Sequence, residues 1–152
     1  MNNWFDITQR EHLDRILKQI DAAAKPSFGR LSAQAMVEHL VDAVEYSNGK
    51  KFTGLDCSEE EAAAQKAKCV HKAFLISRGV TTYLDDATVV SRYASIEDAF
   101  VALHEELDAF DQYCKVEGHT AIHPAFGHLD YQEWVIWHGL HFSHHFRQFG
   151  LE

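Results

Sequence analysis

The sequence predicts an all-α protein, most simply a helix bundle, folded as one domain over residues 1–152. Three observations carry this prediction. Apolar residues recur at helical spacing in five segments of ten or more residues. Residues that favour helix N-termini precede these segments. Proline occurs only twice, at Pro26 and Pro124, and both positions lie between the predicted helices.

The first two predicted helices lie in the N-terminal third of the chain. The first spans residues 9–24, and Thr8 with Glu11 has the pattern of a capping box. The second spans residues 32–47, begins at an N-cap serine and ends before Asn48–Gly49. The apolar faces consist of Leu13, Ile16, Leu17, Ile20 and Ala24 in the first helix, and of Met36, Leu40, Ala43 and Val44 in the second.

The middle of the chain contains the third predicted helix and a less regular segment. Ser58 with Glu61 is a second capping-box pattern, and the helix that it begins is predicted to end near Arg78, before Gly79. Residues 80–93 are rich in β-branched side chains, so a short strand or an extended crossover is predicted there.

Two more helices are predicted in the C-terminal part of the chain. Ser95 is the N-cap of the fourth helix, which ends at Gly118, and residues 119–129 are predicted to form a loop. A third capping-box pattern begins the last helix, residues 130–149, and Gly150 is well placed to end it.

The net charge of −9 is concentrated in the C-terminal part of the chain. Residues 93–152 contain 10 acidic and 2 basic side chains, whereas residues 1–92 are nearly neutral. An acidic surface repels phosphate backbones, so we expect no nucleic-acid partner. No apolar stretch approaches the roughly 18–20 residues of a membrane helix, and the N-terminus has no signal-peptide pattern. We therefore expect a cytoplasmic protein with no membrane partner.

Histidine is the residue type that stands out, because the chain has 11 and four of them lie between residues 138 and 145. At about 100° per residue, His141 and His145 differ by about 40° and lie one turn apart on one face of the last predicted helix. With this spacing a helix presents two imidazoles to one metal ion. His138 lies about 20° from the direction of His145 but about two turns away, and His144 lies about 60° from His141, on the flank. Spacing alone therefore also permits His141 to pair with either of them.

A third ligand must come from another helix, and His39 is the best candidate. It sits among apolar residues of the second predicted helix, where a solvated histidine has little reason to be. Three neutral imidazoles leave a fourth position open for water, as in catalytic zinc sites, and imidazole also suits nickel, copper and iron. Asp42 and Glu38 are candidate acceptors for the other ring N–H of His39, and Asp42 is also a candidate fourth ligand. The alternative is that these histidines are packed or surface side chains without a metal.

Three motifs lie near the two ends of the chain. The first is LSAQAMVEHL, residues 31–40, which contains the histidine of the second helix. The second is HFSHH, residues 141–145, and the third is Gln148, which completes HHFRQ. The segment HPAFGHL, residues 123–129, followed by Trp134, accompanies them. Together these motifs resemble the DinB/YfiT-like superfamily of metal-dependent enzymes, and in particular an uncharacterised branch of it.

The resemblance implies a four-helix bundle with up-down-down-up topology and a long crossover after the second helix. It also implies a divalent metal, zinc or nickel, held by His39, His141 and His145, since the second histidine of the HH pair is the ligand. Characterised relatives include thiol-dependent transferases and isomerases, in which the metal activates a low-molecular-weight thiol. The resemblance names no substrate for this chain.

Two functions follow from these observations. In the first, the chain is a metal-dependent enzyme that transfers a thiol to, or hydrolyses, a small electrophilic molecule. His138 and Asp42 are then the candidate catalytic residues, His138 because its charge is mobile near neutral pH. In the second, the bundle is a noncatalytic metal-binding or structural module that acts as an oligomer or interaction surface.

Seven aromatic residues lie between residues 126 and 149. They indicate either core and dimer packing or an apolar wall around the metal. Exposed aromatics on the last helix would favour a homodimer. The sequence assigns no role to His104, His119, His123 or His128.

Overall fold

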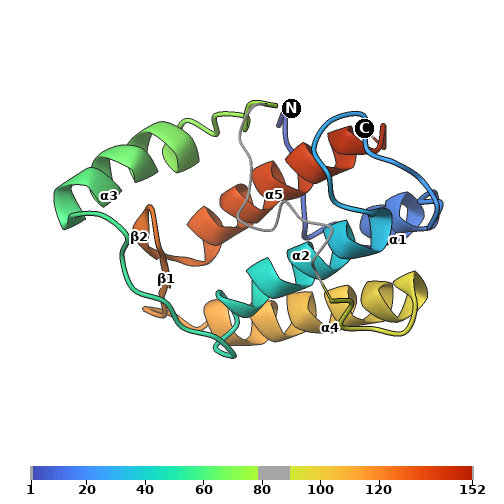
Figure 1. Cartoon of the computed structure of the whole chain (residues 1–152). Helices are drawn as coiled ribbons and strands as arrows, with labels where there is room; N and C mark the ends of the chain where they lie inside the picture. Colours follow the sequence, from blue (N-terminus) through green and yellow to red (C-terminus); the bar gives the residue numbers. More distant parts are fainter. Residues whose placement is uncertain (1, 79–89, 152) are drawn as a thin grey trace.

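A computed structural model describes residues 2–78 and 90–151 of the chain (Figure 1). These residues are mostly helical, which confirms the predicted class in its coarse form. The elements in chain order are α1 (Arg10–Leu17), α2 (Ala33–Glu45), α3 (Glu59–Lys66), the π-helix η1 (Ala67–His71), α4 (Ile96–Cys114), β1 (Ala121–His123), β2 (Gly127–Leu129) and α5 (Tyr131–Gln148).

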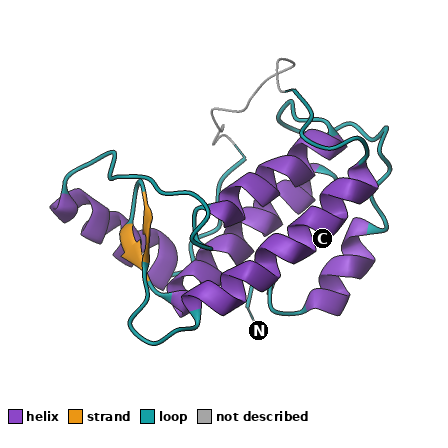
Figure 2. Ribbon diagram, turned by 90° about the horizontal axis from the view of Figure 1, so that it is seen from below, coloured by secondary structure: helices purple, strands orange, loops and turns teal. Residues whose placement is uncertain are grey.

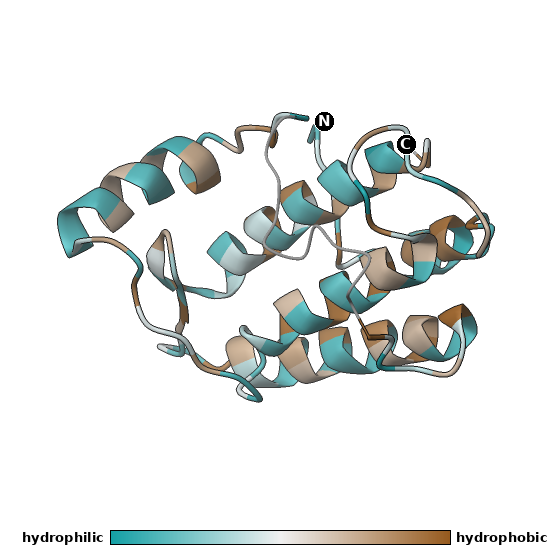
Figure 3. Cartoon of the chain, viewed as in Figure 1, coloured by the Kyte–Doolittle hydropathy of each residue, from teal (hydrophilic) through white to brown (hydrophobic). Residues whose placement is uncertain are grey.

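Helices α2, α4 and α5 lie alongside one another, with α1 beside them, whereas α3 and the β1–β2 hairpin lie at one end (Figures 1 and 2). Figure 3 shows hydrophobic and hydrophilic residues mixed along each helix, as expected for helices that bury one face. The buried faces meet in a single core, which includes Leu13, Leu17, Met36, Leu40, Leu103, Leu107, Phe110, Phe142 and Phe146. Within the described ranges, none of the helices is both long enough and apolar enough to span a membrane.

Four of the five predicted helix N-termini are capped as expected. Ser32 and Ser95 accept hydrogen bonds from backbone N–H groups three residues on. Both later capping boxes, which begin α3 and α5, are complete. The predicted capping box of Thr8 and Glu11 is wrong. The Thr8 hydroxyl instead donates to the Asp6 carboxylate, 2.6 Å away, and Gln9 occupies the N-cap without a side-chain hydrogen bond.

Two helices are much shorter than predicted, and α4 ends at Cys114, a few residues before Gly118. Helix α1 ends at Leu17 rather than Ala24, and the chain beyond it turns where the Asp21 carboxylate accepts from the backbone N–H of Ala23. Such local bonds compete with helix continuation. Helix α3 widens into η1 and stops well before Arg78, because Ala73 has a left-handed φ of +46°.

The segment 119–129, predicted to be a loop, contains a short hairpin. Ala121 pairs with Leu129 and His123 with Gly127, antiparallel. The indole N–H of Trp134 donates to the Ala121 carbonyl at 3.2 Å, so the hairpin is fixed to the first turn of α5. The predicted strand or crossover at 80–93 lies largely outside the described residues, and residues 90–93 form no strand.

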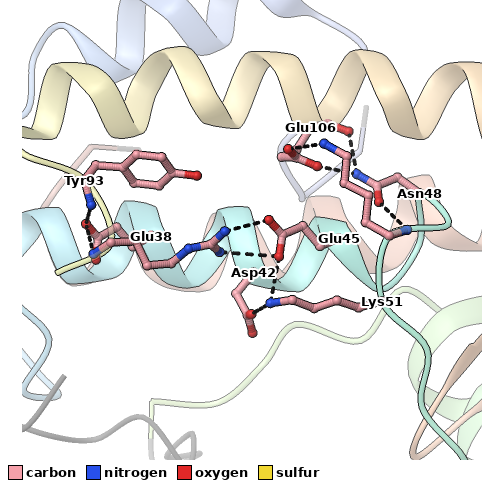
Figure 4. A network of polar contacts seen from close by, with 9 residues as sticks. Glu38, Asp42, Glu45, Asn48, Lys51, Tyr93 and Glu106 are labelled. Atoms are coloured by element: carbon pink, nitrogen blue, oxygen red, sulfur yellow. Dashed lines mark hydrogen bonds and ion pairs between the residues drawn. The ribbon is translucent and has the colours of Figure 1, made fainter. Parts of the chain in front are cut away.

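The long connection between α2 and α4 is fastened to α2 by ion pairs and backbone hydrogen bonds (Figure 4). The buried Glu38 carboxylate accepts from the backbone N–H groups of Arg92 and Tyr93, both at 3.1 Å. Glu45 pairs with Arg92 at 2.8 Å and with Lys51 at 2.7 Å. Burial alone would raise the pKa of the Glu45 carboxyl, but these two cations lower it below its usual value.

Candidate metal site

Three histidine side chains from two helices converge at one point. The Nε2 atom of His141 lies 2.9 Å from Nε2 of His39 and 3.1 Å from Nε2 of His145. All three ligand nitrogens lie within 4.8 Å of one another. His141 and His145 are one turn apart on α5, and His39 reaches them from α2. The structure therefore brings together the three residues that spacing and resemblance selected.

The cluster is shielded from solvent and electrically neutral. His141 and His145 are buried, and His39 is half-buried. Burial lowers the pKa of His39 to about 4 and that of His145 to about 3, and it lowers the pKa of His141 well below its usual value. The neighbouring histidines add to this effect. At neutral pH each imidazole is therefore uncharged and offers a lone pair.

The outer ring nitrogens of the three histidines differ in their partners. His145 Nδ1 lies 2.7 Å from the Oε1 atom of Gln148. The Nδ1 atoms of His39 and His141 are buried and have no hydrogen-bond partner in the part of the chain that the structure describes. Gln148 therefore holds the position that a metal-bound histidine usually gives to an outer acceptor.

The carboxylates expected beside His39 make other contacts. Asp42 forms an ion pair with Lys51. The Glu38 carboxylate accepts hydrogen bonds from the Gln34 side chain and from the backbone N–H groups of residues 92 and 93. No hydrogen bond joins either carboxylate to His39 among the described residues, although Asp42 opposes the effect of burial on the pKa of His39.

The other two histidines of the crowded segment lie outside the cluster. His138 is fully buried, stacks on Trp134 and lies 2.8 Å from the hydroxyl of Ser47. That hydroxyl donates to the Val44 carbonyl, so the ring N–H of His138 donates to it. Burial lowers the pKa of His138 to about 3. His144 packs edge-on against Phe28.

The four histidines without a predicted role also lie apart from the cluster. His123 accepts from the backbone N–H of Ala125, and its ring stacks on Phe126. His119 and His128 make local hydrogen bonds near the hairpin. His104 lies 4.0 Å from Asp14 on α1.

An aromatic wall lies beside His141. The Trp137 ring is parallel to the His141 ring, with their centres 5.8 Å apart. The rings of His123 and Phe126 each meet the Trp137 ring edge-on, with ring centres 4.9 Å apart in both pairs. Sequence reasoning did not single out Trp137, although its i, i+4 spacing to His141 is a usable signal.

The aromatic residues of α5 pack mainly against the chain's own core. Trp134, Phe142 and Phe146 are buried, and Tyr131 and Trp137 are partly buried. The exposed aromatics that would favour a homodimer are therefore absent from α5, and the homodimer stays a prediction without that support.

The donor set fits a divalent metal. Bonds of about 2.0–2.1 Å to zinc at tetrahedral angles would separate ligand nitrogens by about 3.3 Å. The two closest pairs are at 2.9 and 3.1 Å, a few tenths of an ångström below that spacing, and the third pair lies within 4.8 Å. Three neutral imidazoles also suit zinc, nickel, copper and iron.

A comparison with known protein families assigns the chain to one family. The family model described as "Protein of unknown function (DUF1569)" matches residues 10–151. The chain belongs to this family. No curated protein and no solved structure matches this DUF1569 chain. The expectation that the chain belongs to an uncharacterised family is thereby confirmed, whereas this match does not name a superfamily.

Proposed function

We propose that this DUF1569 protein is a metal-dependent enzyme of the DinB/YfiT-like superfamily, with His39, His141 and His145 as the ligands of a divalent zinc or nickel ion. The convergence of the three Nε2 atoms, two pairs of which lie within 3.1 Å, is the observation that carries this proposal. The superfamily's up-down-down-up helix order belongs to the same proposal, supported by the long connection between α2 and α4.

The chain's own residues would prepare the site for chemistry. The low pKa values that burial gives the three imidazoles keep them neutral, so protons compete little with the ion. Gln148 holds the outer nitrogen of His145, and Trp137 covers His141 on one side. A bound divalent ion supplies Lewis acidity, which lowers the pKa of a water or thiol bound to it.

We propose a small electrophilic molecule as the substrate, to which the enzyme transfers a low-molecular-weight thiol or which it hydrolyses. The aromatic wall of Trp137 and Phe126 supports an apolar group on the substrate. His138 and Asp42 stay candidates for proton transfer. His138 is buried against Ser47, and Asp42 is paired with Lys51, so either role requires a change in these contacts. A cytoplasmic location completes the proposal.

Metal analysis of tag-free protein tests the ligand set. One equivalent of metal is expected in the wild type and in His144→Ala, and a large loss is expected in His141→Ala and His145→Ala. His144 is the matched control because it is a buried neighbour whose ring lies outside the cluster. Equal metal content in all four proteins would refute the assignment.

Turnover separates the enzyme from a noncatalytic metal-binding bundle. The loaded protein is assayed with simple thiols and a panel of apolar electrophiles, and turnover should disappear in His145→Ala but persist in His144→Ala. Stoichiometric metal without turnover of any pair would favour the noncatalytic module.

A further inference from the structure

The side chain of Gln148 determines which nitrogen of His145 carries the proton. Gln148 is the last residue of α5 and is only 6% exposed. Its Oε1 atom lies 2.7 Å from His145 Nδ1. A carbonyl oxygen only accepts, so Nδ1 must carry the hydrogen. The lone pair of the neutral ring is then on Nε2, the atom that faces His141 at 3.1 Å.

The loop before α2 holds Gln148 in this position. The backbone N–H and the hydroxyl of Ser27 both donate to the backbone carbonyl of Gln148, at 2.7 and 3.2 Å. Two residues later, Gly29 adopts a left-handed φ of +78°. A Cβ atom at Gly29 would lie 2.6 Å from Nε2 of Gln148 and 3.6 Å from its Cδ. The amide of Gln148 therefore fills the space that a side chain at position 29 would need.

We propose that Gly29 is a positioning residue for the metal site: its missing side chain lets Gln148 reach His145, which keeps Nε2 of His145 free to bind the ion. The inference rests on the proposed metal function. It assigns a role to a glycine that reaches the site only through Gln148 and lies in the loop before α2, far in sequence from His141 and His145.

The geometry also says what a methyl group at position 29 would do. The atom that it meets is the end of a flexible side chain, so Gln148 moves and the fold is kept. His145 then loses its acceptor, and its ring is free to carry the proton on Nε2, where it blocks metal binding. Loss of an outer partner of this kind typically weakens metal affinity about 10–100-fold.

Zinc affinity, measured by competition with a chromophoric chelator, tests whether Gly29 acts on His145 through Gln148. Gly29→Ala and Gln148→Ala should each bind zinc about 10–100-fold more weakly than the wild type. Gln148→Glu should keep most of the affinity, because a carboxylate also accepts from Nδ1. Adding Gly29→Ala to Gln148→Ala should have no further effect, since the amide that the methyl group displaces is already gone.

Gly118→Ala is the matched control. Gly118 has a φ of +80°, nearly that of Gly29, but a Cβ atom there would meet nothing within 4 Å. The Gly118→Ala variant therefore reproduces the backbone strain without moving Gln148, and it should bind zinc like the wild type. Wild-type affinity in Gly29→Ala, or additive losses in the double variant, would overturn the proposal.

Nitrogen-15 NMR of the metal-free protein gives a readout that does not depend on metal. His145 should be the Nδ1–H tautomer in the wild type and in Gly118→Ala, and it should shift toward Nε2–H in Gly29→Ala. An Nε2–H tautomer in the wild type would overturn the proposal. A wild type that binds no zinc but keeps the expected tautomer would instead refute the metal function and leave the positioning role of Gly29 intact.

Discussion

Replacing His138 should make the fold less sensitive to acid. His138 is fully buried, and burial lowers its pKa to about 3, whereas an unfolded histidine titrates near 6.5. The unfolded state thus binds a proton more readily than the folded state. The stability that neutral His138 contributes is complete above about pH 6.5 and is lost as the pH falls from there toward 3.

The size of this loss follows from the two pKa values. A pH of about 5 is about 1.5 units below the pKa of this histidine in the unfolded chain, so the unfolded residue is protonated there. Folded His138 is still neutral at that pH. At 1.36 kcal/mol per unit, the free energy of unfolding is lower by about 2 kcal/mol than at neutral pH. His138→Gln should remove this part of the pH dependence, although the variant loses the stacking on Trp134 and begins less stable at every pH.

Urea unfolding of the metal-free protein at about pH 7.5 and about pH 5 measures the effect. The drop in the free energy of unfolding between the two pH values should be about 2 kcal/mol smaller in His138→Gln than in the wild type. His12→Gln, which changes an exposed histidine, should keep the full drop. If His138→Gln loses as much stability on acidification as the wild type, His138 is not held neutral by burial.

Three further predictions concern the connection onto α2, the end of η1 and the metal. Arg92→Met should lower the free energy of unfolding by about 1–2 kcal/mol in urea titrations, because the buried Glu45 loses one of its two cations; an unchanged midpoint would contradict this. Ala73→Gly should raise the free energy of unfolding by about 1 kcal/mol, because Ala73 has a left-handed φ that glycine adopts without strain. Ala64→Gly, inside α3, should instead lower it. If both variants are destabilised, the backbone at Ala73 is not strained. Zinc at about 100 times its dissociation constant should raise the free energy of unfolding by about 2.7 kcal/mol in the wild type and not in His141→Ala, and equal stabilisation of both would place the ion elsewhere.

The parts of the site that depend on local helix geometry could be predicted from the sequence. The pairing of His141 with His145 is a property of one helix, and the caps of α2 and α5 depend on residues three positions apart. His39 was recognisable because it interrupts an apolar face. The choice of His145 over His144 came from the resemblance; in the structure His145 lies in the cluster, whereas the His144 ring packs on Phe28.

The partners of the histidines could not be predicted, because they depend on how distant segments meet. Asp42 was expected beside His39, but Lys51 in the following loop lies close enough to pair with it. Gln148 takes the corresponding role at His145, and only the path of the loop before α2 brings Ser27 and Gly29 against it. The approach of a loop to a helix end leaves no periodic signal in the sequence.

The hairpin and the helix ends were missed for a different reason. Strands β1 and β2 have three residues each, which is too short for alternation to be visible. What fixes the hairpin is the hydrogen bond from Trp134 to Ala121, a contact between elements. The early end of the third helix depends on the backbone at Ala73, a residue type that ordinarily favours helix.

An anomalous-scattering map of crystals grown with zinc tests the central claim most directly. The account predicts one peak about 2.0–2.1 Å from the Nε2 atoms of His39, His141 and His145, with a coordination position left open beside Trp137. The electron density of the same crystals would show whether Gln148 still contacts Nδ1 of His145. A peak at other side chains, or a fully occupied crystal in which any of the three histidines turns away from the ion, would contradict the account.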